Sequence, residues 1–346
     1  MWYKTLKDLL DTLQFEPSTK DSCLFLRKSG KTRGPKWIFV YVDDLLIIGE
    51  RGSCTETSIE LAKIFKTKDL GNAEFILGIK VTRSKAGMLL NQRAFADALV
   101  DSNMEETLNR SSKSALPINQ DSNPIDDEAL TVSDSSTYRS IVGAIGYLAN
   151  TTRPDLSVAF SILGTYVCQP TNKSWRLAQY CLTYVHETLD LRLMFRTKDQ
   201  RSSEVTKLEN ELKVYSDSDW AGDTGSVSTH RRSRSGTHVT LYGGTIDWKS
   251  KLQSVILLSS TEAEYYAAIQ SSKCALHLRV LLHEIQNGRM KNADHELVLP
   301  PLQVYMDNQS AIAQIGSSDV EGYSIVTHPG EILLVEGYSI VGIFEI

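Results

Sequence analysis

Two adjacent carboxylates, Asp43 and Asp44, interrupt the apolar run W-I-F-V-Y-V-D-D-L-L-I-I-G at residues 37–49. Burying two neighbouring charges is costly unless something neutralises them. A tight turn between two β-strands avoids that cost, because it places both carboxylates at a surface where a hard cation such as Mg²⁺ can bind them. The run therefore predicts a β-hairpin with a metal-binding turn, against the plainer alternative of an ordinary hairpin turn.

Composition limits the classes of function. The 346 residues suffice for two or three domains, with 41% hydrophobic and 23% charged residues. The sequence has no apolar run of about 18 residues, so we expect no membrane span, and its start does not resemble a secretory signal. Five scattered cysteines argue for a reducing compartment and against a zinc site. The net charge of −5 argues against a general nucleic-acid binder, although basic residues cluster in H-R-R-S-R-S-G at 230–236.

Periodicity predicts a mixture of helices and strands. Apolar residues at helical spacing indicate helices at 4–14, 55–66, 92–103, 138–150, 174–187 and 261–285. Apolar β-type runs beyond the hairpin indicate strands at 75–81, 212–216, 237–248, 254–258 and 303–307. Polar residues 104–137 carry little periodicity and predict a linker. Strands followed by a helix–strand–helix alternation suggest a mixed α/β domain after residue 212.

A second group of carboxylates lies in that last region. We expect Asp217 near the end of a strand, Glu264 on a helix and Asp307 at the end of a later strand. Three carboxylates on separate elements are what two Mg²⁺ ions need to activate water against an RNA phosphodiester. Glu262 and Glu264 diverge by about 200° on a helix, so only one of them can face the metals. Asp219 shares a strand face with Asp217 and is the fallback ligand.

Several motifs resemble the Pol polyproteins of copia-type LTR retrotransposons. Y-V-D-D-L-L-I-I-G at 41–49 is similar to the reverse transcriptase catalytic motif of that family. Segments 68–79, 87–92, 138–143 and 152–155 resemble, in family order, the region after the catalytic hairpin, the entry to the thumb and the connection region. The later motifs resemble the family's ribonuclease H: R-R-S-R-S-G, G-G-T-I-D-W-K-S-K-L-Q-S, S-S-T-E-A-E-Y and D-N-Q-S-A-I.

The resemblance implies an α+β fold in which part of a reverse transcriptase precedes a ribonuclease H-like domain. The implied divisions are the palm and thumb at 1–103, the linker at 104–137, the connection at 138–200, ribonuclease H at 212–316 and an aberrant tail at 317–346. That tail contains the heptapeptide V-E-G-Y-S-I-V twice. Two copies are too few for a solenoid, so we expect a duplication or a gene-model artefact.

The resemblance also implies the site residues and their partners. The implied catalytic residues and ligands for Mg²⁺ (or Mn²⁺) are Asp43, Asp44, Asp217, Glu264 and Asp307. The implied substrate-binding residues are Arg231, Arg232, Trp248, Lys249 and Lys251. The implied partner is an RNA–DNA hybrid or a primer–template, with no membrane, and the expected compartment is the cytoplasm, or the nucleus by family logic. Asp247 departs from the family's small polar residue and adds negative charge near the substrate.

Two expected ligands are missing from the sequence. Asp8, Asp11 and Asp21 precede Asp43, and none matches the family's third polymerase aspartate. Neither Asp319 nor His328 matches its fourth ribonuclease H ligand. We therefore expect a truncated chain without polymerase activity that keeps, at best, impaired ribonuclease H activity. The alternative is a catalytically inert remnant with at most weak nucleic-acid binding.

Overall fold

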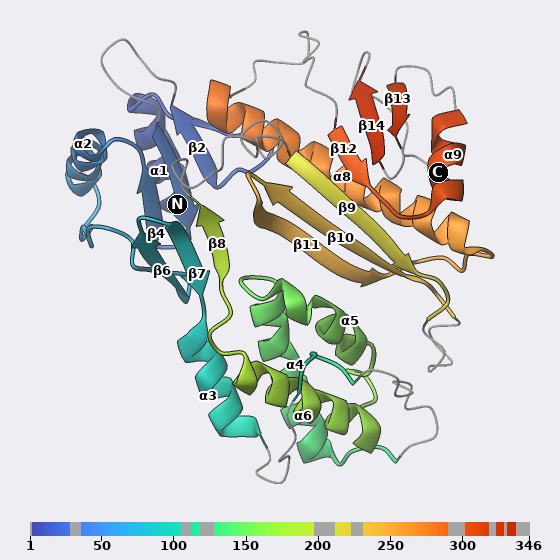
Figure 1. Ribbon diagram of the computed structural model, residues 1–346. Coiled ribbons are helices and arrows are strands. Elements are labelled where there is room, and N and C mark those ends of the chain that lie inside the picture. Colours follow the sequence, from blue (N-terminus) through green and yellow to red (C-terminus); the bar gives the residue numbers. More distant parts are fainter. Residues whose placement is uncertain are drawn as a thin grey trace. The chain divides into compact units, whose positions relative to one another are not determined.

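The computed structural model describes residues 2–27, 36–104, 112–117, 128–196, 212–222, 231–289, 302–317, 323–328 and 331–336. These residues form two compact units. The first contains residues up to 73 together with 273–289, and the second contains 74–272 together with 302–336. No helix in the described ranges is long and apolar enough to cross a membrane. The fold is a mixture of helices and sheets, as the sequence predicts (Figure 1).

The first unit is a four-stranded antiparallel sheet packed against helices. Its elements are α1 (Trp2–Thr12), β1 (Glu16–Pro17), β2 (Leu24–Arg27), β3 (Lys36–Tyr41), β4 (Asp44–Ile48) and α2 (Arg51–Ala62), with the sheet order β1-β2-β3-β4. The apolar stripe of α1 supplies Leu6 and Leu10, which are buried with Ile38 and Val40 of β3. The predicted helix at 4–14 and the predicted hairpin at 37–49 are both confirmed.

The end of a long helix, α8 (Ser260–Asn287), also belongs to this unit. Its Glu284 is fully buried, and its carboxylate accepts hydrogen bonds from the Ser18 hydroxyl at 2.5 Å and the Thr19 hydroxyl at 2.9 Å. The Trp37 indole N–H donates to the Ile285 carbonyl at 2.9 Å. These bonds fix the last turns of α8 to residues that precede it by about 250 positions.

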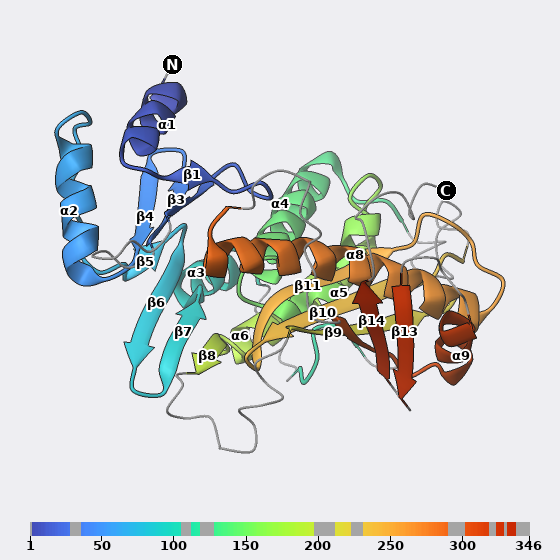
Figure 2. The same cartoon turned by 90° about the horizontal axis from the view of Figure 1, so that it is seen from above.

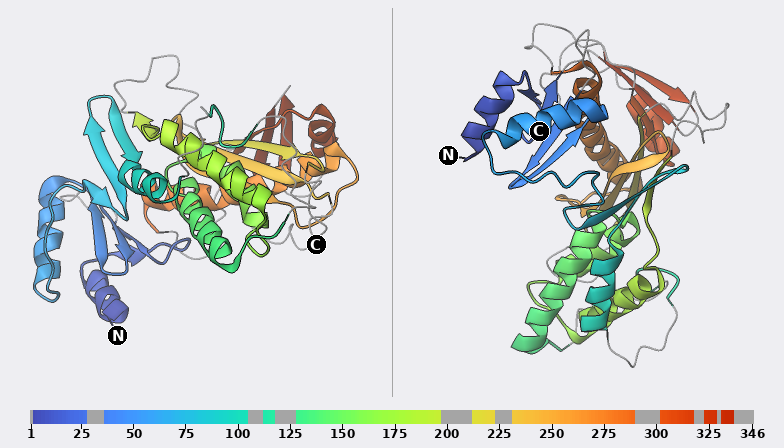
Figure 3. Two further views of the ribbon diagram at one scale, coloured as in Figure 1. Left: turned by 90° about the horizontal axis from the view of Figure 1, so that it is seen from below. Right: turned by 90° about the vertical axis from the view of Figure 1, so that its left-hand side faces the viewer.

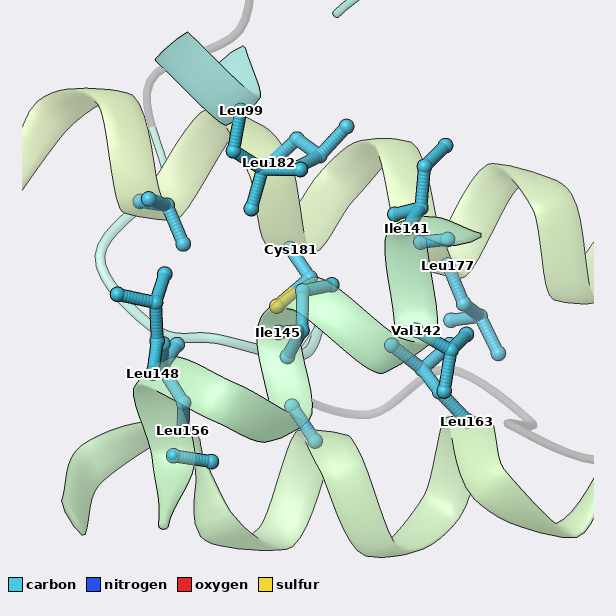
Figure 4. Close-up of a cluster of buried hydrophobic side chains, with 14 of the residues drawn as sticks. Leu99, Ile141, Val142, Ile145, Leu148, Leu156, Leu163, Leu177, Cys181 and Leu182 are labelled. Atoms are coloured by element: carbon cyan, nitrogen blue, oxygen red, sulfur yellow. The ribbon is translucent and has the colours of Figure 1, made fainter. Parts of the chain in front are cut away.

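The second unit contains a helical cluster and two sheets. The helices are α3 (Arg93–Asn103), α4 (Val132–Ala149), the 3-10 turn η1 (Pro154–Leu156), α5 (Ser157–Thr165) and α6 (Asn172–Glu187). Figure 3 shows them in cyan to green, and Figure 4 shows their shared core, in which Leu99, Ile145, Leu163 and Leu182 meet. Each of these four side chains is at most 7% exposed, so the cluster has a well-packed core of its own.

The first sheet of this unit joins residues far apart in the chain. It has the order β5 (Phe75–Ile76), β6 (Ile79–Ser84), β7 (Gly87–Asn91) and β8 (Leu193–Arg196). The single strand predicted at 75–81 is wrong, because Leu77 and Gly78 have φ of 50° and 72° and form a tight turn between β5 and β6. Periodicity gave no indication of β8, which has only four residues.

The second sheet carries the carboxylates. Its order is β11 (Gly244–Leu252), β10 (Arg234–Leu241), β9 (Leu212–Asp219), β12 (Leu302–Tyr305), β14 (Glu331–Glu336) and β13 (Tyr323–His328). Neighbouring strands are antiparallel except for β9 and β12, which are parallel. The first part of α8 lies across one face of this sheet (Figure 2), where the Ser271 hydroxyl is 2.7 Å from that of Thr237. Helix α9 (Gln309–Ser317) follows β12.

Two further expectations differ from the structure. The strand predicted at 254–258 is wrong, because these residues form the irregular lead into α8. Helix α4 begins at Val132 and not at Tyr138, since the Thr131 hydroxyl caps it by accepting the Asp134 N–H at 3.2 Å. Part of the duplicated tail forms the β13–β14 hairpin, which extends the sheet beside β12. The domain boundaries expected from the resemblance remain predictions, because the two compact units do not follow chain order.

Candidate metal centre

Asp217 and Asp307 lie where two parallel strands separate. Strands β9 and β12 pair in register as far as Tyr215 and Tyr305, and each aspartate lies two residues further along its chain. Since side chains alternate along a strand, each aspartate projects from the same face as its tyrosine. The residues between them, Ser216 and Met306, are each 5% exposed, so the opposite face is the covered one. Both aspartates therefore lie on the open face of the sheet, and both are exposed.

Glu264 reaches this place from α8. The first turn of that helix is held by Gln253, a buried residue whose Nε2 donates to the Ala263 carbonyl at 3.1 Å and to the Ser235 hydroxyl at 2.9 Å. Glu264 itself is 5% exposed, and its Oε1 accepts the Ser218 N–H at 3.0 Å, beside Asp217. Its Oε2 is buried and has no hydrogen-bond partner.

The three carboxylates form one cluster. An oxygen from each of Asp217, Glu264 and Asp307 lies within 4.8 Å of the others, and this is the only such acidic or metal-ligating cluster of three or more among the described residues. Carboxylate oxygens are the ligands that Mg²⁺ and Mn²⁺ prefer. The unpartnered Oε2 of Glu264 gives a second reason why a cation fits, since a buried carboxylate oxygen without a partner is costly.

The cluster changes the acidity of its buried member. Burial first, and then the negative charges of Asp217 and Asp307, raise the pKa of Glu264 to about 7, although the hydrogen bond from the Ser218 N–H lowers it. A carboxyl group that titrates near neutrality binds a cation in competition with a proton. Perturbed acidity in a cluster with a defined geometry is typical of functional sites.

The sequence left Glu262 and Asp219 as alternative ligands, and the structure places both outside the cluster. Glu262 is exposed and points away from the cluster, because its carboxylate accepts the Leu258 N–H at 2.8 Å at the start of α8. Its own N–H donates to the Ser259 hydroxyl at 3.2 Å, which caps the start of the helix. Asp219, on the same strand face as Asp217, is not a member of the three-carboxylate cluster. The geometry thus brings together Asp217, Glu264 and Asp307.

Asp43 and Asp44 occupy the predicted turn between β3 and β4. Tyr41 pairs with Asp44 across the hairpin, Val42 has a φ of 47°, and both aspartates are exposed. No third carboxylate accompanies them within the part of the chain that the structure describes. The exposed turn is therefore confirmed, and a metal-binding role for it remains a prediction.

The predicted substrate-binding residues divide between the two faces of the sheet. By register, Lys251 lies opposite Ser235 and Lys249 lies opposite Thr237, on the face covered by α8. Lys249 forms an ion pair with Asp247 at 3.7 Å, so the charge of Asp247 faces away from the carboxylate cluster.

The other predicted substrate-binding residues lie on the open face or at its end. Trp248 lies on the open face, where its indole N–H donates to the Ala149 carbonyl at 2.5 Å. Arg231 and Arg232 precede β10 at the end of the sheet where Asp217 lies. Their roles toward substrate remain predictions.

Sequence reasoning missed the two tyrosines on the open face. The rings of Tyr215 and Tyr305 stack with their centroids 5.0 Å apart and their planes 19° apart. The signal was present, because V-Y-S-D and V-Y-M-D place a tyrosine two residues before each aspartate. Two residues is the repeat of a strand face, so the spacing alone indicates that ring and carboxylate are neighbours on one surface.

Comparisons with known proteins give a consistent result. A family profile described as "Reverse transcriptase (RNA-dependent DNA polymerase)" matches residues 1–119. The chain is 33% identical to the retrovirus-related Pol polyprotein from transposon RE2 of Arabidopsis thaliana, over 90% of this chain and 19% of that protein. It is 29% identical to the corresponding protein from transposon TNT 1-94 of Nicotiana tabacum, over 90% of this chain and 22% of that protein.

A shorter relative matches over most of its own length. This uncharacterized mitochondrial protein of Arabidopsis thaliana is 31% identical over 67% of this chain and 89% of its own length. The chain thus spans about a fifth of the Pol polyproteins that it matches. No solved structure gives a significant match. The chain belongs to the Pol polyprotein family of copia-type LTR retrotransposons, and its reverse transcriptase-like segment includes the hairpin that presents Asp43 and Asp44.

Proposed function

We propose that this segment of a copia-type Pol polyprotein cleaves the RNA strand of RNA–DNA hybrids by two-metal chemistry at Asp217, Glu264 and Asp307. The observation that carries the proposal is the convergence of these three carboxylates, from two strands and a helix, to within 4.8 Å of one another. The same three positions are the ones that the ribonuclease H motifs of the sequence imply as metal ligands. The proposed domain is ribonuclease H-like and comprises β9 to β12 with α8.

The residues of the cluster have different proposed tasks. The exposed carboxylates of Asp217 and Asp307 face the substrate and hold divalent cations from the solvent side. The buried carboxylate of Glu264 completes the cluster, because its Oε1 is fixed by the Ser218 N–H and its Oε2 has no hydrogen-bond partner that would compete with a cation. Mg²⁺ or Mn²⁺, when bound, lowers the pKa of a coordinated water and stabilises the charge that develops on the phosphate.

We further propose that this chain alone does not polymerise DNA. Asp43 and Asp44 would supply two metal ligands, and no third carboxylate lies with them among the described residues. Holding two cations around a phosphoryl centre needs ligands from more than one element. The proposed partner is therefore an RNA–DNA hybrid at the second cluster, with a primer–template at the first in the longer polyprotein.

A cleavage assay tests the proposal directly. The full chain is incubated with a hybrid labelled on its RNA strand, in Mg²⁺ or Mn²⁺ and then in a chelator. We expect cleavage that requires the metal, is lost in Asp217→Asn and is retained in Glu262→Gln, which changes a neighbouring carboxylate outside the cluster. Metal-independent cleavage would contradict the two-metal proposal, and no cleavage would favour the inert remnant. A primer-extension assay on the same protein should give no product.

A further inference from the structure

The open face of the sheet carries a row of aromatic rings beside the carboxylates. The register aligns Tyr305, Tyr215, His238 and Trp248 across β12, β9, β10 and β11. The Tyr215 and His238 rings are 5.7 Å apart, which continues the tyrosine stack onto the next strand. Tyr215 is 40% exposed and is the accessible ring of the row, because at the other end the Trp248 indole is held against α4 by its hydrogen bond to the Ala149 carbonyl.

The next row along the strands is that of the metal cluster. Gly236 of β10 is in register with Asp217 of β9. Asp307 lies two residues beyond Tyr305, which is itself in register with Tyr215. A Cβ added at Gly236 would meet only Asp217 atoms, at 3.8 and 3.9 Å. Because glycine has no side chain, nothing from this position of β10 covers Asp217. A strand of nucleic acid can therefore approach the carboxylates from the side of the aromatic row.

A positive charge lies on the other side of the aromatic row. Lys213 precedes Tyr215 by two residues on β9 and so shares the open face with it. Lys213 is half-buried, in register with Thr240 of β10 and Gln303 of β12. Lysine, an uncharged aromatic ring and carboxylate thus follow one another on one strand, over about 13 Å for four residues of β-strand.

We infer that Lys213 and Tyr215 position one strand of a bound nucleic acid along β9, so that its next phosphate lies over Asp217. This inference rests on the proposed function. A nucleic-acid backbone repeats a negative phosphate and an apolar sugar with a base, and the open face presents partners for both. Lys213 offers a cation to a phosphate. Tyr215 offers a ring against which a base or sugar can pack.

The aromatic row adds no negative charge beside the three carboxylates. Three carboxylates repel a polyanion, so a neighbouring contact must attract the strand without adding further negative charge. Tyr215 adds no carboxylate, and burial lowers the pKa of His238, so that the His238 ring stays neutral to a lower pH than an ordinary histidine. On β9 and β10, the other charged residues of this face are Lys213 itself, Asp219 at the end of β9, and Arg234 at the start of β10, which is buried and donates a hydrogen bond to the Ser161 hydroxyl of α5. Lys213 therefore supplies the electrostatic attraction for the phosphates, and Tyr215 supplies the packing surface for a base or sugar.

Binding measurements test the inference separately from cleavage. The full chain is titrated into a fluorescein-labelled RNA–DNA hybrid in Ca²⁺, and fluorescence anisotropy is followed at several salt concentrations. The variants are Tyr215→Leu, which removes the ring, Tyr215→Phe, which keeps it, and Lys213→Gln. The matched controls are Phe95→Leu, which removes a 37% exposed ring on α3, and Lys7→Gln, which makes the same charge change on an exposed lysine of α1.

The expected pattern is specific to contact with the strand. Tyr215→Leu should raise the Kd about fivefold to a hundredfold, and Tyr215→Phe should leave it within about twofold. Lys213→Gln should raise the Kd and lower the slope of log Kd against log salt by about one. The two controls should match the wild-type protein in both quantities.

Several outcomes would overturn the inference. They are unchanged binding in Tyr215→Leu, an unchanged salt slope in Lys213→Gln, an equal loss in the controls, or no hybrid binding by the wild-type protein. If the variants weaken binding as expected and the wild-type protein does not cleave the hybrid, the proposed function fails, and the contacts of Lys213 and Tyr215 with nucleic acid stand without a catalytic role. If the wild-type protein cleaves in a metal-dependent manner and the variants bind like it, the inference alone fails.

Discussion

The backbone N–H of Ser218 donates to Oε1 of Glu264 at 3.0 Å, which joins the strand that bears Asp217 to the helix that bears the buried carboxylate. This bond fixes one oxygen of Glu264 and leaves Oε2 without a partner in the cluster. The negative charge at Glu264 is therefore oriented but not compensated by the described residues around it. Its acidity and its effect on stability can both be measured.

Metal affinity should depend on pH near neutrality. Burial and the neighbouring aspartates raise the pKa of Glu264 to about 7, so below that pH a cation must displace a proton. We expect the Mg²⁺ affinity to rise up to about tenfold per pH unit between pH 6 and 7 and to level off above pH 8. Calorimetry in two buffers with different ionisation enthalpies should show nearly one proton released per binding event at pH 6. Equal affinities at pH 6 and pH 8 would contradict this assignment.

Replacing Glu264 should stabilise the metal-free protein at high pH. The pKa of Glu264 is about 7 in the folded state, against an ordinary value of 4.5, so between these values the folded state binds more protons than the unfolded state. Stability consequently falls as pH rises through this window, and the loss is complete above about pH 7. Glu264→Gln removes that loss, so at pH 8 we expect its free energy of unfolding to exceed that of the wild-type protein by at least about 1 kcal/mol.

Urea unfolding in a chelator measures this difference. The gain from Glu264→Gln should be small near pH 4.5, where the folded wild-type carboxyl group is protonated and the unfolded one is about half protonated. Glu262→Gln is the matched control, and its loss of a cap-like contact to Leu258 predicts a modest destabilisation of about 0.5–1 kcal/mol. A destabilised Glu264→Gln variant at pH 8 would show that the buried charge is compensated.

Gly87 should not tolerate a side chain. Its φ is 142°, and a Cβ built there would lie 2.1 Å from the Phe195 carbonyl oxygen of β8. Gly87→Ala must therefore separate β7 from β8, and we expect a loss of more than about 2 kcal/mol in the free energy of unfolding. Gly143→Ala, in the interior of α4 with nothing within 4 Å, should instead stabilise by about 0.5–1 kcal/mol. Equal effects of the two substitutions in a urea titration would refute this reading of the β7–β8 pairing.

The buried Arg153 should contribute strongly to stability. Its Nη2 donates to the Asp155 carboxylate at 2.7 Å and to the Thr188 hydroxyl at 2.6 Å, and the residue is 4% exposed. Arg153→Ala leaves these acceptors without a donor, so we expect a loss of about 2–3 kcal/mol. Arg93→Ala breaks an exposed ion pair with Asp190 and should change stability by less than about 0.5 kcal/mol. Thermal unfolding measures the change in Tm for both variants, and similar changes in Tm would argue against a structural role for Arg153.

The sequence anticipates the elements that have long or strongly alternating apolar patterns. The hairpin that presents Asp43 follows from apolar runs on both sides, and the divergence of Glu262 from Glu264 follows from helical geometry. Asp217 and Asp307 could be placed at strand ends, but their proximity depends on the parallel pairing of β9 with β12. That pairing joins residues about 90 positions apart, which no local pattern encodes.

Other features escaped for identifiable reasons. The first turns of α4 are polar, V-S-D-S-S-T, and only the Thr131 cap and Asp134 in the first turn mark its start. Leu77 adopts a positive φ in the turn between β5 and β6, although leucine is a poor turn residue by composition. The face on which Lys249 and Lys251 lie depends on the register of β11 against β10, which is set by tertiary pairing.

Helix α8 runs unbroken from Ser260 to Asn287, with Glu264 in its first turns and Glu284 near its other end. Severing the chain before residue 212, which chain order would suggest as a way to isolate the second cluster, takes Ser18 and Thr19 away from Glu284. An excised C-terminal piece would then expose to water a carboxylate that is fully buried and hydrogen-bonded in the intact chain. Loss of activity in such a piece would therefore reflect damage to that end of the helix, and it would not be evidence about the chemistry at Glu264.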